Sequence, residues 1–281
     1  MIIVKPVGGL ANRMRVIAAS VQLAHEIGTT VQCIWESNNE LGANYTDLFE
    51  LSEHFSLRAP FRHRPKSSYQ KTGLKHFIIT LWNKMLGVDA CYSMSNVDSI
   101  IAGEQNENAD YHRFFDVISP LLAKDKIIFY TTGDYLADLH DVSLFNPVEE
   151  IRKVIESYAL CFSNKTYGLH IRRTDNTWAI ENSPLNLFRA IIESKIAEDD
   201  EVRFYLSTDD KETLQALKEE YGEHILIREK KYGRDSLDAM KDAVVDMWLL
   251  SKTQQIYGSY YSSFSEMAGL VGHIPVMTVK R

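Results

Sequence analysis

Two adjacent arginines stand directly after an apolar run in the segment Tyr167–Asn176, which reads YGLHIRRTDN. If this run is a strand, its alternate residues share a face, so His170 and Arg172 would point the same way. The planar guanidinium of arginine suits the oxygens of a diphosphate, and Asp175 could hold one guanidinium in place. The alternative is a surface ion pair between Arg173 and Asp175, which would contribute about 0–1 kcal/mol.

A glycine turn near the N-terminus is a second candidate site. Gly8 and Gly9 follow the apolar run Ile2–Val4 and precede a helical pattern that carries Asn12 and Arg13. Glycines let a backbone approach a ligand closely, and the start of a helix offers free N–H groups and a positive dipole end. A two-glycine turn is also a routine connector, so this segment predicts a ligand site only in combination with the others.

A third segment places hydroxyls and carboxylates after an apolar run. Phe204–Asp210 ends with Ser207, Thr208, Asp209 and Asp210. One of the two carboxylates could cap the helix that follows, which leaves the other to accept hydrogen bonds from a base or a sugar hydroxyl. No second acidic cluster at suitable spacing supports a metal site here, so we expect no metal.

A serine-rich turn and a carboxylate in an apolar helix complete the set. Ser262, Ser263, Phe264 and Ser265 follow a short apolar run, where hydroxyl and backbone groups could donate to phosphate. A capping box between a serine and Glu266 is the alternative, and both readings can hold at once. Upstream, Asp246 stands among apolar residues and needs a partner, which would be solvent or the N–H groups of a ligand.

The elements that must position these residues alternate between strand and helix. We expect strands at 2–4, 31–35, 127–130, 167–171, 202–206, 224–227, 255–258 and 275–279, with helices at 12–27, 148–158, 185–197, 210–221, 236–251 and 263–270. This order predicts parallel sheets with helices on both faces, where ligands bind at the carboxyl ends of strands. In residues 36–125 the apolar residues do not recur at the regular spacing of a helix or a strand. A break at Asn146-Pro147 predicts two domains, residues 1–146 and residues 147–281.

Composition and charge exclude several classes of protein. The chain has 281 residues, 45% of them hydrophobic and 25% charged, as in ordinary globular proteins. A net charge of −7 argues against a dedicated nucleic-acid binder. The three cysteines have no CxxC spacing, and the sequence shows neither a signal peptide nor an apolar run long enough to span a bilayer. We therefore expect a cytoplasmic protein.

One stretch opposes the overall negative charge. Residues 55–88 contain seven Lys or Arg and no acidic residue, and they include the apolar run from Phe77 to Trp82. Such a composition attracts anionic membrane surfaces or lipid-diphosphate acceptors, which predicts peripheral contact with the inner face of a membrane. A solvated loop with a small buried helix is the alternative.

Taken in order, these segments resemble the fucosyltransferase superfamily, which includes α1,2-, core α1,6-, nodulation and protein O-fucosyltransferases. The Gly-Gly-Leu-Ala-Asn-Arg turn resembles the opening loop of that family, and residues 170–175 match its His-x-Arg-Arg-x-Asp motif. Phe204–Asp210 resembles its second motif, and Asp246 with the turn at 262–265 resembles its third. The resemblance covers residues 1–28 and about 165–272.

This resemblance implies an α/β, GT-B-like architecture of two Rossmann-like domains that face a donor-binding cleft. It implies inverting, metal-independent transfer of fucose from GDP-fucose to a glycan, lipid-linked or peptide acceptor. Arg172 would bind the β-phosphate, with Arg173 and Asp175 bracing the site. His170, Asp209 and Asp246 would contact the guanosine, Ser262–Ser265 would contact the phosphates, and Gly8, Gly9, Asn12 and Arg13 would line the donor side of the other domain. Another GDP-sugar as donor, or a non-catalytic nucleotide-sugar-binding protein of the same fold, is the alternative.

Overall fold

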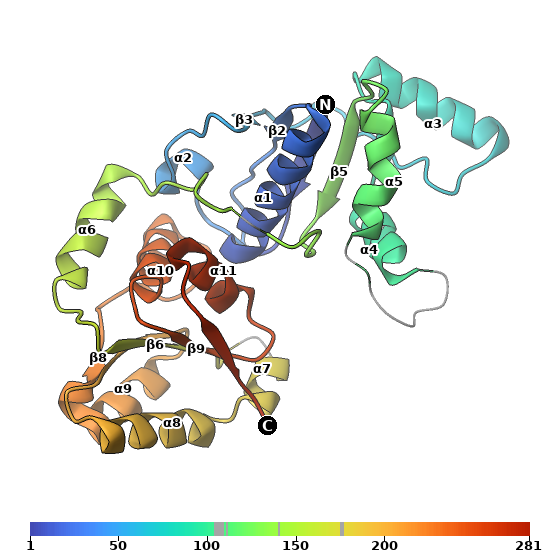
Figure 1. Cartoon of the computed structure of the whole chain (residues 1–281). Helices are drawn as coiled ribbons and strands as arrows, with labels where there is room; N and C mark the ends of the chain where they lie inside the picture. Colours follow the sequence, from blue (N-terminus) through green and yellow to red (C-terminus); the bar gives the residue numbers. More distant parts are fainter. Residues whose placement is uncertain (104–109, 111, 140, 175–176) are drawn as a thin grey trace. The chain divides into compact units, whose positions relative to one another are not determined.

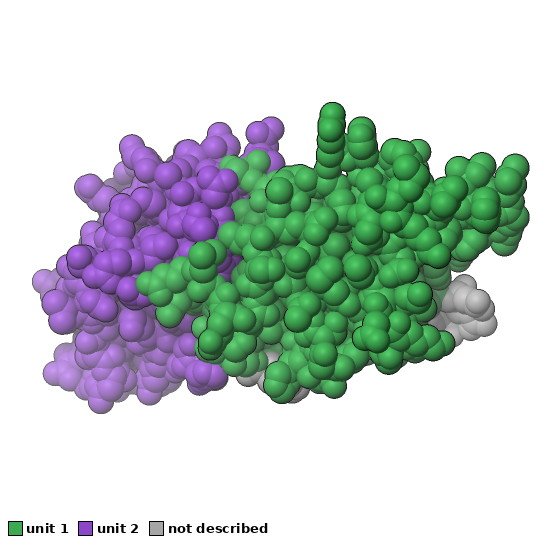
Figure 2. Space-filling view, turned by 90° about the horizontal axis from the view of Figure 1, so that it is seen from above, with its two compact units in different colours: residues 1–37, 50–146 green, residues 38–49, 147–281 purple. Residues whose placement is uncertain are grey.

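The computed structural model describes residues 1–103, 110, 112–139, 141–174 and 177–281. The chain forms two compact units, which Figure 2 colours separately. Unit 1 comprises Met1–Ser37 and Glu50–Asn146, and unit 2 comprises Asn38–Phe49 and Pro147–Arg281. The segment 38–49, which the sequence pattern placed with the N-terminal domain, thus belongs to unit 2.

Unit 1 is built on a five-stranded parallel sheet in the order β3-β2-β1-β5-β4. Its strands are β1 (Ile2–Pro6), β2 (Val31–Cys33), β3 (Ser56–Leu57), β4 (Ala90–Tyr92) and β5 (Ile128–Thr132). Its helices are α1 (Leu10–Ile27), α3 (Gly73–Met85), α4 (Met94–Ala102) and α5 (Arg113–Leu122). Helix α1 ends at Gly28, whose φ of 73° provides the left-handed conformation that closes many helices.

The two faces of the unit 1 sheet are covered differently. On one face, the ring of Tyr130 on β5 packs edge-on against Phe114 of α5 at 4.9 Å between centroids, and its hydroxyl contacts Ser20 of α1 at 2.6 Å. On the other face, Cys91 of β4 and Phe129 of β5 belong to a small buried cluster against which Phe61 packs. Phe61 comes from the irregular segment between β3 and α3, so this face is covered partly by loop.

Unit 2 is built on a second five-stranded parallel sheet, in the order β10-β9-β6-β7-β8. Its strands are β6 (Thr166–Ile171), β7 (Arg203–Thr208), β8 (Ile225–Leu226), β9 (Ile256–Ser259) and β10 (Val276–Val279). Its helices are α2 (Tyr45–Leu48), α6 (Glu149–Ala159), α7 (Thr177–Asn182), α8 (Leu185–Glu198), α9 (Lys211–Tyr221), α10 (Leu237–Leu250) and α11 (Ser263–Gly272), with a 3-10 turn at Gly222–His224.

Helices cover both faces of the unit 2 sheet, as Figure 1 shows, with α8 and α9 on one side and α10 and α11 on the other. Phe188 of α8 and Leu217 of α9 are fully buried in one cluster with Leu169 and Ile171 of β6. These alternate residues of β6 face the core, which leaves His170 on the opposite face. The predicted fold class, α/β with two parallel sheets, is confirmed. None of the helices in the described ranges is long and apolar enough to cross a membrane.

Candidate functional site

Three neighbouring strands of unit 2 bring the predicted residues to one edge of the sheet. His170 on β6 lies opposite Ser207 on β7 and opposite Gly258 on β9. Because all three strands are parallel, the residues that follow them meet at their shared carboxyl edge. The Arg172–Thr174 loop, Asp209 and the turn from Ser259 to Ser262 therefore lie together, within one unit.

Asp209 organises the loop that carries the two arginines. One of its carboxylate oxygens accepts from the backbone N–H of Arg173 at 2.7 Å, and the other accepts from the Thr174 hydroxyl at 2.7 Å. The Arg172 Nε lies 3.6 Å from the same carboxylate, and the Arg172 backbone N–H donates to the Ser259 hydroxyl at 3.0 Å. The Arg172 side chain is thus held at the edge while part of its surface stays exposed.

Arg173 points elsewhere and has a different task. Its guanidinium donates to the backbone oxygen of Ser183 at 2.5 Å, and Ser183 in turn accepts from the N–H of Tyr260 at 2.7 Å and donates to the backbone oxygen of Val279. Burial lowers the pKa of Arg173, although the guanidinium stays charged. Arg173 therefore ties the loop to the start of α8 and to β10. Asp175, its predicted partner, lies outside the described residues.

His170 is buried as a neutral imidazole. Its ring stacks on Phe264 of α11 at 4.8 Å between centroids, and its Nδ1 lies 3.3 Å from the Ser262 hydroxyl. Burial, together with the nearby positive charge of Arg172, lowers the pKa of His170 to about 3. The imidazole thus carries no charge at neutral pH and can serve only as a hydrogen-bonding and stacking group there.

Asp246 of α10 has four protein donors. Tyr205 at 2.7 Å and Arg228 at 2.9 Å donate to one oxygen, and Ser207 at 2.9 Å and Lys230 at 2.5 Å donate to the other. Burial alone would raise the pKa of Asp246, but Lys230 and Arg228 outweigh burial and hold the pKa at about 2. A carboxylate has about four lone-pair sites, so its acceptor capacity is filled by the protein.

The remaining polar residues of the second motif are also engaged within the protein. Asp210 caps α9 by accepting from the N–H of Thr213 at 2.8 Å, which settles which of the two neighbouring carboxylates is the cap. The buried hydroxyl of Thr208 accepts from the N–H of Asp210 at 3.2 Å.

The N-cap residue of α11 does not cap the helix with its side chain. Ser262 occupies the N-cap position, but its hydroxyl makes no capping hydrogen bond, so the alternative of a capping box is wrong for this residue. Ser265 donates back to the Ser262 carbonyl at 3.1 Å. The preceding residue, Tyr261, has a φ of 54°, which is an uncommon and strained conformation for a bulky side chain. A helix start whose N-cap side chain makes no capping bond, beside a strained turn, suits an anion.

The glycine turn of unit 1 is shaped by Arg13. The Arg13 side chain is 1% exposed, and its guanidinium donates to the backbone oxygens of Gly8 at 2.8 Å and Glu36 at 2.6 Å. Its guanidinium also lies over the ring of Trp35 at 5.1 Å. Gly8 has a φ of 85°, which favours glycine, and Asn12 lies against it. Arg13 therefore fixes the turn that the sequence singled out.

The unit 2 site also contains residues that the sequence analysis missed. One network surrounds the buried Asp246 and includes the buried Tyr205 and Arg228 and the partly exposed Lys230 and Asp242; Arg228 contacts both carboxylates. Arg228 and Lys230 stand in a loop with no motif, between β8 and α10. Only the buried charge of Asp246 signalled that cations had to be near. Among the described residues, no group of three or more His, Cys, Asp or Glu is placed to hold a metal ion.

No family model matches the sequence, and no curated protein matches it by sequence. Solved structures do match. A point mutant of Arabidopsis thaliana FUT1 in complex with GDP superposes with a TM-score of 0.66 at 15% identity, over all of this chain and 70% of that one. Bradyrhizobium NodZ alpha-1,6-fucosyltransferase soaked with GDP-fucose superposes with a TM-score of 0.60 at 14% identity, over 96% of this chain and 91% of that one. POFUT1 in complex with GDP superposes with a TM-score of 0.57 at 9% identity, over 99% of this chain and 98% of that one. The chain therefore has the two-sheet, GT-B-like fold of these fucosyltransferases.

Proposed function

We propose that this chain is a glycosyltransferase that takes its sugar from a GDP-sugar, and that the sugar is fucose. The observation that carries the proposal is the carboxyl edge of the unit 2 sheet, where Asp209 and Ser259 hold Arg172 at the same edge as the turn that leads into α11. Solved fucosyltransferases of the same fold were crystallised with GDP or GDP-fucose, which supports a guanosine diphosphate at this edge.

The arrangement fits the charge that develops when a glycosyl–phosphate bond breaks. Negative charge grows on the departing diphosphate, and Arg172 with the positive dipole end of α11 would stabilise it. These groups are fixed before the reaction by Asp209 and by the β9–α11 turn, so little reorganisation is needed. We propose inverting transfer to an acceptor hydroxyl, with Arg172 in place of a metal as the principal positive charge.

The residues around Arg172 take supporting roles in this proposal. His170, neutral and stacked on Phe264, would contact the guanosine through hydrogen bonding, and Ser262–Ser265 would contact the phosphates. Asp246 would act by holding Lys230 and Arg228 at the site, because its own oxygens already accept four hydrogen bonds. Asn12 and Arg13 of unit 1 would serve the donor side through the turn at Gly8 and Gly9.

Calorimetric titration with GDP-fucose and GDP-mannose, followed by a transfer assay over glycan, lipid-linked and peptide acceptors, tests the proposal. We expect GDP-fucose to bind more tightly than GDP-mannose, and fucose to reach at least one acceptor. Tighter binding of GDP-mannose would favour another GDP-sugar as donor. Binding of GDP-fucose without hydrolysis or transfer on any acceptor would favour a nucleotide-sugar-binding protein.

A further inference from the structure

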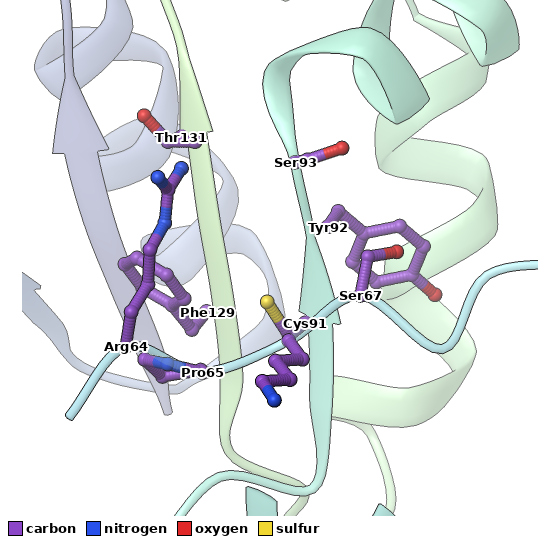
Figure 3. A pocket seen from close by; sticks show the side chains of 9 residues that line it. Arg64, Pro65, Ser67, Cys91, Tyr92, Ser93, Phe129 and Thr131 are labelled. Atoms are coloured by element: carbon purple, nitrogen blue, oxygen red, sulfur yellow. The ribbon is translucent and has the colours of Figure 1, made fainter. Parts of the chain in front are cut away.

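Unit 1 contains a cavity of about 300 Å³, shown in Figure 3. Its walls come from β4 with the residue that follows it, from β5, and from the segment between β3 and α3: Arg64, Pro65, Lys66, Ser67, Cys91, Tyr92, Ser93, Phe129 and Thr131. Pockets of this size are in the range that binds small molecules. None of the residues of the unit 2 site contributes to it.

The cavity exists because loop covers this face of the sheet. Cys91 and Phe129 form its floor, and the segment from Arg64 to Ser67 passes over them (Figure 3). Asn83 of α3, fully buried, fixes that segment by accepting from the Lys66 N–H at 2.9 Å and donating to the Lys66 carbonyl at 2.7 Å. A covering segment pinned in this way keeps the cavity open in a defined shape.

Two polar groups in the cavity have no protein partner. Thr131 is only 6% exposed, and its hydroxyl makes no hydrogen bond with any described residue. The end of the Arg64 side chain lies beside Thr131 in Figure 3, and its guanidinium likewise makes no hydrogen bond or ion pair with any described residue. Arg64 is an exposed residue, and the Thr131 hydroxyl is not sealed from solvent, so both groups are accessible to a ligand in the cavity.

The charge of the cavity is positive. Arg64 and Lys66 line it, and no lining residue is acidic. Burial raises the pKa of the Cys91 thiol to about 12, so the thiol adds no negative charge at neutral pH. The hydroxyls of Ser67 and Ser93 already donate to the Asn96 Oδ1, so Thr131 is the lining hydroxyl that remains to donate to a ligand. This combination suits a tetrahedral oxyanion.

We propose that this cavity binds a phosphate or diphosphate group, with Arg64 and Thr131 as its principal donors. We further assign this group to the acceptor substrate of the transferase. The second step rests on the proposed function, whereas the binding of the anion does not.

Calorimetric titration with inorganic pyrophosphate tests the site, using the full chain carrying Arg172→Ala so that the unit 2 edge contributes less. We expect Arg64→Ala or Thr131→Val in that background to weaken pyrophosphate binding about tenfold. Arg62→Ala is the matched control, because Arg62 is exposed in the same segment but does not line the cavity. An equal loss from Arg62→Ala and Arg64→Ala, or no binding at all, would overturn the proposal. Binding here with no GDP-sugar binding would leave this site standing and remove only its assignment to an acceptor.

The source of the phosphate is tested by a second arm with farnesyl diphosphate in place of pyrophosphate. Tighter binding of the prenyl compound, still sensitive to Arg64→Ala, identifies a lipid-linked acceptor. Equal binding of the two compounds identifies a soluble phosphorylated acceptor. Farnesyl diphosphate binding that is insensitive to both Arg64→Ala and Thr131→Val would contradict the site.

A separate observation concerns the surface of α3. The helix buries only Asn83, and an exposed apolar stripe runs along it at helical spacing: Leu74 73%, Phe77 64%, Ile78 56%, Leu81 53% and Met85 75% exposed. In Figure 1, α3 extends away from the sheet of its unit. Lys71, Lys75 and Lys84 flank the stripe, and no acidic residue occurs from 54 to 88.

We infer that this face of α3 docks on an anionic lipid surface. An apolar stripe bordered by lysines, without compensating carboxylates, is the pattern of helices that lie in the membrane interface. The stripe and its flanking lysines complement a surface that is both apolar and anionic, which the acyl chains and headgroups of anionic lipid provide. This inference predicts contact with the surface of a membrane and no crossing of it.

Co-sedimentation with vesicles of neutral lipid, and with vesicles containing about one third anionic lipid, tests the inference. We expect binding to the anionic vesicles only, and a loss of about tenfold in Phe77→Asp. Leu160→Ser is the matched control, because Leu160 is an 86% exposed leucine of unit 2. Binding that Phe77→Asp leaves unchanged would overturn the inference. So would a wild-type dimer that ignores vesicles and that Phe77→Asp dissociates.

Discussion

At the scale of single residues, most of the predicted donor-binding groups make hydrogen bonds or ion pairs with other residues of the protein. Asp209 accepts hydrogen bonds from the Arg172–Thr174 loop, and the Arg173 guanidinium ties this loop to the Ser183 carbonyl. Asp246 accepts hydrogen bonds from four protein donors. The sequence could indicate these residue types and their order. The sequence could not indicate which of these residues would make contacts within the protein, because those contacts depend on distances between strands that lie far apart in the chain. Arg228 and Lys230 were missed for the same reason.

The buried imidazole of His170 predicts a loss of stability in mild acid. Its pKa is lowered to about 3, whereas an unfolded histidine has a pKa near 6.5. Below about pH 6 the unfolded chain therefore takes up a proton that the folded chain does not. Unfolding becomes easier by about 1.4 kcal/mol per pH unit until about pH 3.

Urea unfolding at several pH values between 7 and 5 measures this slope. We expect His170→Gln to have a smaller slope than the wild type, whereas His25→Gln, which removes an exposed imidazole, should leave the slope unchanged. Identical slopes in the wild type and His170→Gln would contradict the buried neutral state of His170.

At the scale of elements, the helices and strands of unit 2 follow the sequence pattern closely. The expected strand at 167–171 became β6 (Thr166–Ile171), and the helix at 185–197 became α8 (Leu185–Glu198). Each of these two elements has regularly spaced apolar residues and a clear boundary in the sequence. Residues 36–125 were unreadable because their elements are short, as with β3 (Ser56–Leu57), or lack a buried face, as with α3. The apolar stripe of α3 faces no core, so its spacing did not indicate how the helix packs within its unit.

The junction of β9 and α11 depends on Gly258. A Cβ at this position would lie 2.4 Å from the Ser265 Oγ and 2.7 Å from its Cβ, so Gly258→Ala should push α11 away from β9. We expect a loss of about 1–3 kcal/mol in stability and weaker GDP binding, because the start of α11 moves. Adding Ser265→Gly removes both contacts and should restore part of the stability. Urea unfolding and GDP titration of the single and double variants measure this. A double variant no more stable than Gly258→Ala alone would refute the close approach.

At the scale of the whole molecule, each of the two units is formed by two separate segments of the chain. Leu41, Tyr45, Leu48 and Phe49 are buried, and Phe49 contacts Trp248 of α10 at 5.8 Å between ring centroids. The Gly42 N–H also donates to the Arg234 carbonyl at 2.6 Å. A break at Pro147 was visible in the sequence. The return of residues 38–49 to the second unit was not, because it depends on contacts with Arg234 and Trp248, which lie far along the chain.

This segment predicts that residues 147–281 alone are unstable. Each large apolar side chain lost from the core removes about 1.5–3 kcal/mol, and total stability is only about 5–15 kcal/mol. We expect residues 147–281 to unfold at much lower urea than the same residues carrying 38–49 through a flexible linker. A polar segment of equal length in place of 38–49 is the control. Equal stability with 38–49 and with the polar segment would contradict the assignment of 38–49 to unit 2.

The central claim is that the carboxyl edge of the unit 2 sheet binds the diphosphate of a guanosine nucleotide through Arg172. Calorimetric titration of GDP into wild type, Arg172→Ala and Arg203→Ala tests it most directly. Arg203 begins β7 and so lies at the opposite end of the same sheet, which makes it the matched loss of one positive charge. We expect Arg172→Ala to bind GDP at least about tenfold more weakly and Arg203→Ala to bind like the wild type. A GDP affinity of Arg172→Ala within about threefold of the wild type would contradict the account.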